Sequence, residues 1–225
     1  MMNTTQSAAR ILDRLKDIHG EPARRTSGDP VKGLVGTILS QNTSDTNSSR
    51  ALDNLLNEFP SWEAVFSADV GEIESAIRPG GLAGQKAPTI QRALSAIYDR
   101  QGAIDATFLD DLDDSDAMAF LTGIKGVGQK TAACVLMFDL ERDVLPVDTH
   151  VHRVTRRIGL VPSSADAIRT QEILERLIAP EDRYAAHVLF IRHGRATCRS
   201  RNPRCEECVV LDLCEYPSKN VEDSD

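Results

Sequence analysis

The chain has 225 residues, of which 41% are hydrophobic and only 4% aromatic, so an aliphatic core is expected in one large or two small domains. Residues 1–20 are too polar for a signal peptide, and the longest apolar run, Ala132–Phe138, is too short to span a bilayer. These features exclude a membrane protein and predict a soluble, intracellular protein of the cytoplasm. The net charge of −8 disfavours nucleic-acid binding, because Lys and Arg contacts to phosphate drive such binding. This holds only if charge is averaged over the whole chain.

Apolar residues recur at helical spacing almost throughout the chain. Ile11, Leu12, Leu15 and Ile18 mark a first helix, and a second begins after Pro30, a residue favoured at helix starts. No convincing alternating strand pattern or internal repeat occurs, so the sequence predicts an all-α protein. The second helix is expected at 31–40, and further helices at 45–59, 69–77, 86–100, 107–121, 129–139, 149–159, 165–178 and 181–197, with a flexible tail at 217–225.

The charged residues are unevenly distributed. Residues 192–204 carry five arginines and no acid, among them Arg199, Arg201 and Arg204, and residues 153–157 carry three more. Acidic residues concentrate at 105–116 and 222–225. A basic face on an acidic body is compatible with DNA binding, although ordinary solvated arginines would give the same pattern.

Four cysteines near the C-terminal end have the spacing Cys198-x6-Cys205-x2-Cys208-x5-Cys214. One tight pair flanked by two outlying thiols favours a loop around an iron–sulfur cluster with four thiolate ligands. A zinc site, which usually shows two paired knuckles or histidines, and simple reduced thiols are the alternatives. The fifth cysteine, Cys134, is expected to be a buried, small apolar residue.

The segment Leu121–Ala133 predicts a helix–hairpin–helix. Gly126 and Gly128 allow a tight turn and close backbone approach, and Val127 can anchor the turn in the core. Backbone N–H groups at the start of the next helix can bind a phosphate without base preference. A plain turn between two helices is the alternative for this segment.

Lys130 falls in the first turn of the helix that follows the hairpin. The helix dipole disfavours a cation there, which favours the neutral amine that can form a Schiff base. Asp148, eighteen residues later, is well placed to cap the helix that begins near Val151, and a carboxylate at this position could also transfer protons or stabilise a cationic transition state. A solvated lysine and a purely structural cap are the alternatives.

Three motifs in order, G-V-G-x-K-T-A, V-D-T-H-x-x-R-V and H-G-R-x-T-C ending in the cysteine pattern with C-E-Y, resemble the endonuclease III family. These are iron–sulfur DNA glycosylase/AP lyases of the helix–hairpin–helix superfamily, and the resemblance runs from about residue 30 to 216. It implies a two-lobed α fold, with a six-helix bundle at 26–141 and a second lobe from 1–25 plus 142–216 that carries the cluster loop. DNA would bind across the cleft between the lobes.

The resemblance also implies roles for individual residues. Lys130 would be the nucleophile and Asp148 the essential carboxylate, while the four cysteines would hold a [4Fe–4S] cluster. The loops Gln41-Asn42-Thr43 and Gly81–Ala87 match the family's wedge loops, so Gln41 and Leu82 would fill the gap left by an extruded base. Phosphate contacts are expected from Gly126, Val127, Gly128, Arg199, Arg201 and Arg204.

The implied partner is double-stranded DNA that contains damaged bases or abasic sites, bound by a monomer. The implied reaction removes oxidised pyrimidines and cuts the strand 3′ to the abasic site by β-elimination. Lys125 and Asn42 depart from the family pattern, which leaves lesion preference open. The alternatives are a monofunctional glycosylase that activates water, a non-catalytic DNA-binding module and a zinc-stapled helical scaffold.

Overall fold

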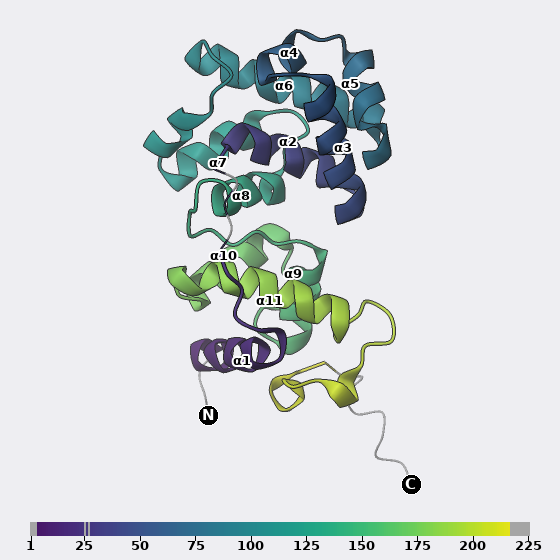
Figure 1. Cartoon of the computed structure of the whole chain (residues 1–225). Helices are drawn as coiled ribbons and strands as arrows, with labels where there is room; N and C mark the ends of the chain where they lie inside the picture. Colours follow the sequence, from purple (N-terminus) through teal and green to yellow (C-terminus); the bar gives the residue numbers. More distant parts are fainter. Residues whose placement is uncertain (1–3, 25, 27, 217–225) are drawn as a thin grey trace. The chain divides into compact units, whose positions relative to one another are not determined.

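The computed structural model describes residues 4–24, 26 and 28–216, and this part of the chain contains helices and no strand (Figure 1). The predicted all-α fold is therefore confirmed. The α-helices are α1 (Thr4–His19), α2 (Pro30–Ser40), α3 (Asp45–Glu58), α4 (Trp62–Ser67), α5 (Val70–Ile77), α6 (Ala83–Gln101), α7 (Asp114–Gly123), α8 (Gln129–Phe138), α9 (Thr149–Ile158), α10 (Ala167–Leu177) and α11 (Arg183–Ala196). Short 3₁₀ helices are η1 (Arg78–Gly80), η2 (Thr107–Asp111), η3 (Pro180–Asp182), η4 (Cys205–Glu207) and η5 (Leu211–Leu213).

The chain forms two compact units, with boundaries after Arg24 and after Arg142. The middle unit lies between these two points and contains α2 to α8. The terminal unit combines α1 with α9, α10, α11 and the loop that follows them. Segments from the two ends of the sequence therefore share one core in the terminal unit.

Helix α2 is central to the middle unit. Pro30 occupies its first position, and the Asp29 side chain accepts a hydrogen bond from Lys32 N at 2.9 Å, so both the backbone and a cap fix its start. Helices α3, α6 and α8 all pack against it (Figure 1). Its apolar residues recur at helical spacing and are all buried: Val31, Leu34, Val35, Ile38 and Leu39.

The terminal unit is built around α11. Helix α9 packs against α11, and α1 lies along it as well (Figure 1). Leu15, Val154 and Phe190, one from each of these helices, are fully buried in the shared core. Cys198, Cys208 and Cys214 are partly buried against the same core, so the cysteine loop is packed onto the unit rather than extending from it.

Most predicted helices are present and end within two residues of the expected positions, but three stretches differ. The stretch 107–121 was expected as one helix and is instead η2 followed by α7, because Asp113 accepts a hydrogen bond from Asp116 N at 2.8 Å and caps a new helix. Helix α6 begins at Ala83, ahead of the expected start, and continues through Pro88. The short helix α4 has no counterpart among the predicted helices.

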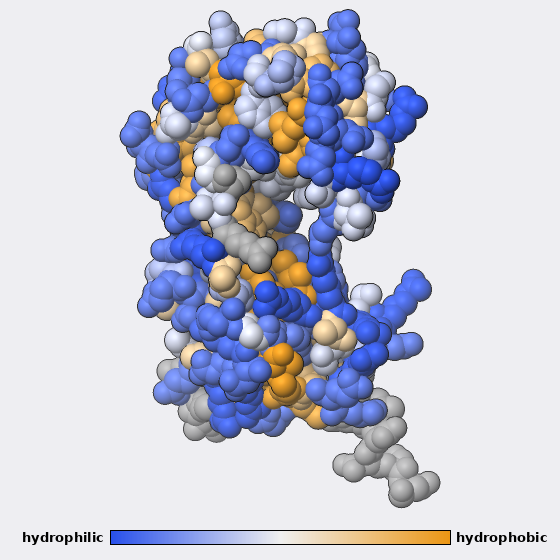
Figure 2. Space-filling view, in the orientation of Figure 1, coloured by the Kyte–Doolittle hydropathy of each residue, from blue (hydrophilic) through white to orange (hydrophobic). Residues whose placement is uncertain are grey.

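Hydrophilic side chains cover most of the visible face of each unit, with scattered apolar patches between them (Figure 2). The large aliphatic side chains are instead packed inside, as the low aromatic content requires. Within the described ranges, no helix combines the length and apolarity needed to cross a bilayer.

Candidate active site and metal centre

The predicted hairpin is a tight turn between α7 and α8. Val127 N donates to Ile124 O at 2.9 Å, and the Val127 side chain is 4% exposed, so it anchors the turn. Gly126 has φ +104°, and a Cβ there would lie 2.6 Å from Thr89 Oγ1, so the site requires glycine. A Cβ at Gly128 would meet no atom within 4 Å. Packing inside the protein therefore does not require glycine at position 128.

Lys130 lies in the first turn of α8, and its side chain is exposed. Its neighbour Thr131 is buried, and Thr131 Oγ1 accepts a hydrogen bond from Gln41 Nε2 at 3.2 Å. The same Gln41 nitrogen donates to Gly126 O at 3.3 Å. The structure thus brings one predicted wedge residue, the hairpin and the turn that carries Lys130 together within the middle unit.

Leu82, the second predicted wedge residue, has the left-handed backbone conformation, with φ 52° and ψ 30°. This conformation costs a non-glycine residue about 1–2 kcal/mol. The side chain is 45% exposed, so burial recovers only part of that cost. Asn42, beside the other wedge residue, also has φ 52°, and asparagine tolerates this region better than most residues. The departure at Asn42 therefore has a local backbone reason.

One buried side chain binds backbone groups close to both wedge residues. Lys86 is 2% exposed, and its Nζ donates to Leu39 O at 2.7 Å and to Gly80 O at 2.9 Å. Burial lowers the pKa of Lys86, which is the property expected of a Schiff-base lysine. The Lys86 amine is enclosed by protein, however, whereas the predicted nucleophile Lys130 is exposed. Sequence reasoning missed Lys86 because lysine is rarely buried, although its spacing from Ile90 and Ile97 is that of a core position.

Asp148 is the N-cap of α9, in the terminal unit. Its Oδ1 accepts a hydrogen bond from Val151 N at 2.8 Å, and the residue is half-buried. In the described part of the chain, Oδ2 accepts no hydrogen bond. One carboxylate oxygen therefore holds the helix start, while the other can serve a reacting group.

Cys198, Cys205, Cys208 and Cys214 all line one cavity, together with His193 and Tyr216. Burial raises the pKa of Cys208. Among the described residues, no three His, Cys, Asp or Glu side chains converge as a single metal ion requires. Thiols placed around a shared cavity fit a cluster of several iron ions better than one tetrahedral zinc ion. Cys134 is buried on α8 in the other unit, where the sequence predicts a small apolar residue.

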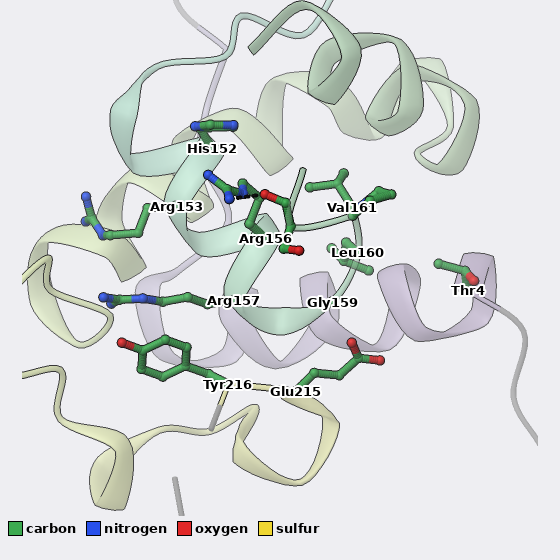
Figure 3. Close-up of a pocket in the computed structure, with 12 residues that line it drawn as sticks. Thr4, His152, Arg153, Arg156, Arg157, Gly159, Leu160, Val161, Glu215 and Tyr216 are labelled. Carbon is green, nitrogen blue, oxygen red and sulfur yellow. Dashed lines mark hydrogen bonds between the residues drawn. The ribbon is translucent and has the colours of Figure 1, made fainter. Parts of the chain in front are cut away.

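Two arginines of α9 hold the cysteine loop. Arg157 donates to Cys198 Sγ at 3.6 Å, to Arg199 O at 2.6 Å and to Ser200 O at 3.1 Å, and it stacks on the Tyr216 ring at 4.4 Å (Figure 3). Arg153 donates to Cys198 O at 3.0 Å. The 153–157 cluster thus uses two of its three arginines to brace the loop, a role that sequence spacing did not indicate.

Arg199, Arg201 and Arg204, the predicted phosphate contacts of the loop, are all exposed. Arg204 pairs with Glu207 at 3.5 Å, which offsets part of its charge.

The fold and the site define a base excision repair protein with a metal centre. The chain matches the HhH-GPD superfamily base excision DNA repair protein model over residues 35–180, and the iron–sulfur binding domain of endonuclease III over residues 198–214. The second match spans the four cysteines and confirms the predicted [4Fe–4S] cofactor.

Relatives place the chain more closely. Endonuclease III of Sulfolobus acidocaldarius is 36% identical, over 84% of this chain and 82% of its own length. A protein of Arabidopsis thaliana that is provisionally named a DNA glycosylase is 40% identical over 84% of this chain. The chain spans 65% of that protein's length. A solved structure of a trapped endonuclease III–DNA covalent intermediate aligns with TM-score 0.82 at 26% identity, over 97% of this chain and 99% of that one. The chain belongs to the endonuclease III family.

Proposed function

We propose that the chain is a bifunctional DNA glycosylase/AP lyase that removes oxidised pyrimidines from double-stranded DNA. The observation that carries this proposal is the exposed amine of Lys130 in the first turn of α8, directly after the hairpin. A binding module needs the hairpin but has no need of a nucleophile at this position. A monofunctional glycosylase, which activates water, has no need of it either.

A damaged base inside the duplex stack is out of reach of Lys130, so the nucleotide must first be extruded. Gln41 and Leu82 would fill the resulting gap and keep the duplex kinked. The exposed, strained Leu82 supports this role, since an apolar side chain in that conformation gains little where it is. Backbone N–H groups of Gly126 and Gly128 would bind the phosphates beside the lesion, since Val127 N already donates to Ile124 O.

The chemistry then needs one amine and one carboxylate. Lys130 Nζ attacks C1′, the bond between C1′ and the base breaks, and the base leaves with a proton. The sugar opens to an imine that acidifies the C2′ proton, and loss of that proton expels the 3′ phosphate. Asp148 would stabilise the cationic transition state or accept a proton through the oxygen that does not cap α9.

Cys198, Cys205, Cys208 and Cys214 would hold the [4Fe–4S] cluster, which supplies structure to the loop rather than a reacting group. Arg199, Arg201 and Arg204 would then meet DNA phosphates from the cluster loop. One lesion needs only one copy of the site, so we propose that the protein acts as a monomer. Because the substrate is DNA, we also propose that it acts in the cytoplasm, at the nucleoid.

Borohydride trapping tests this function directly. Wild type, Lys130→Ala and the matched control Lys125→Ala are each incubated with duplex DNA that carries one abasic site or one oxidised thymine. Lys125 is an exposed lysine of the same hairpin, so it controls for loss of charge. We expect a covalent adduct with wild type and, at saturating DNA, with Lys125→Ala, but none with Lys130→Ala.

The alternatives predict other outcomes. Base release without an adduct from wild type would indicate a monofunctional glycosylase. Binding without base release or strand cleavage would indicate a non-catalytic module. An adduct that persists in Lys130→Ala would show that the nucleophile is a different amine.

A further inference from the structure

Three side chains on one face of α6 contact the loops of the middle unit that carry its predicted DNA-binding residues. Lys86, Thr89 and Arg92 are spaced three residues apart, so they follow one another along the same side of the helix. Lys86 binds backbone carbonyls near both wedge residues, and Arg92 binds the hairpin. We infer that Lys86 is a positioning residue that sets both wedge loops for base extrusion. This inference rests on the proposed function.

Lys86 satisfies the ends of two helices at once. The last carbonyls of a helix lack partners within the helix and carry the negative end of its dipole. Leu39 O belongs to the last turn of α2, and Gly80 O ends η1. The Lys86 ammonium binds both, at 2.7 Å and 2.9 Å. Among the described residues, no backbone hydrogen bond connects these two helix ends, so the Lys86 ammonium joins them.

The joined carbonyls lie directly before the predicted wedges. Gln41 is two residues after Leu39, and Leu82 is two residues after Gly80. A shift of either carbonyl would therefore move the wedge residue that lies two positions further along the chain. Since both carbonyls bind the same nitrogen, the two wedges keep a fixed separation, which insertion into one gap in the duplex requires.

The burial of Lys86 indicates that its two hydrogen bonds offset the desolvation of the amine. A lysine is rarely buried without a partner, because removing its charge from water is unfavourable. Two backbone carbonyls hold the amine, and burial lowers the pKa of Lys86. A methionine of similar length would fill this space without the desolvation penalty. The amine thus provides orientation that packing alone would not.

Arg92 has the corresponding role for the hairpin. Its Nε donates to Lys125 O at 3.0 Å, and its Nη2 donates to Thr89 Oγ1 at 2.8 Å. Thr89 in turn packs against Gly126, where no Cβ fits. One helix face therefore supports the wedge loops through Lys86 and the phosphate-binding turn through Arg92. The two contributions can be separated by mutation.

The test compares Lys86→Met with two variants of the same helix. Arg92→Met loosens the hairpin, and Gln91→Met removes a comparable bond, from Gln91 Nε2 to Ala68 O at 2.8 Å, in a loop with no predicted DNA contact. Each protein is assayed under single-turnover conditions on two substrates, an oxidised thymine in a duplex and an abasic site in single-stranded DNA. The second substrate needs no base extrusion. A fluorescent base analogue opposite the lesion reports unstacking directly.

We expect Lys86→Met to slow base removal from the duplex by about 10–100-fold and to change single-strand cleavage by less than about twofold, because a small misplacement of the wedges affects only the extrusion step. The unstacking signal should fall with the duplex rate. Arg92→Met should instead weaken binding to both substrates, and Gln91→Met should resemble wild type on both.

Equal losses on both substrates in Lys86→Met would overturn the inference, as would a duplex rate equal to that of wild type. Should Lys86→Met not fold, Lys86→Arg retains donors with altered reach, and a duplex-specific loss there supports the inference while an equal loss on both substrates refutes it. Failure of the wild type on both substrates would instead refute the proposed function itself.

Discussion

The two roles of Asp148 can be separated by two substitutions. Its Oδ1 caps α9 through one hydrogen bond of 2.8 Å to Val151 N, and asparagine caps helices about as well as aspartate. Asp148→Asn should therefore keep the unfolding free energy within a few tenths of a kcal/mol of wild type. Asp148→Ala loses the cap and should cost about 1 kcal/mol, in a range of roughly 0.5–2 kcal/mol. For a chain of this length, that loss lowers the melting temperature by about 2–4 °C.

Both variants remove the carboxylate, so both should slow base removal by about 10²–10⁴-fold, the usual contribution of a positioned acid or base. Thermal unfolding and single-turnover base release, measured on the same preparations, provide the test. The reasoning is refuted if Asp148→Asn removes the base at the wild-type rate. It also fails if the activity of the two variants falls in proportion to their stability, since the carboxylate would then act only as a cap.

Gly126→Ala should destabilise the hairpin by about 1–3 kcal/mol and weaken DNA binding, because its Cβ would lie 2.6 Å from Thr89 Oγ1 at φ +104°. In a denaturant titration, adding Thr89→Ala should recover part of the lost stability. Leu82→Gly should raise the unfolding free energy by about 1 kcal/mol through release of the left-handed strain, yet slow duplex base removal; a simultaneous loss of stability would contradict the wedge role. Cys208→Ser should abolish the cluster's visible absorbance and destabilise the terminal unit first. In this variant, the fluorescence of the single tryptophan, Trp62, reports only on the middle unit. It should therefore change at a higher denaturant concentration than the one at which helical circular dichroism begins to fall.

The sequence predicted the elements that rest on local signals. Hydrophobic periodicity and capping residues located most helices, and the hairpin motif placed Lys130 in the first turn of α8, where the structure has it. Asp148 was expected to cap the next helix, and its side chain does so. Each of these features is set by residues within a few positions of one another, which is why one sequence suffices to find them.

The remaining features depend on contacts between distant segments. Lys86 has the helical spacing of the buried residues Ile90 and Ile97, but a lysine is rarely buried, and only the folded ends of α2 and η1 supply the carbonyls that bind its amine. Leucine disfavours the left-handed conformation, so no local preference predicts the backbone of Leu82. Arg153 and Arg157 fit a DNA-facing cluster in the sequence, yet the cysteine loop occupies their donors. In each instance tertiary structure overrides the local tendency of the residue.

The discontinuous terminal unit has a consequence for synthesis on the ribosome. Helix α1 is made before α11, and its core partners on α11 emerge about 175 residues later, which at 5–20 residues per second is a delay of roughly 10–35 s. During that interval the middle unit can fold completely, while the apolar residues Ile11, Leu12 and Leu15 have no core to enter. The apolar face of α1 therefore stays without its core partners on α11 until the end of the chain is made.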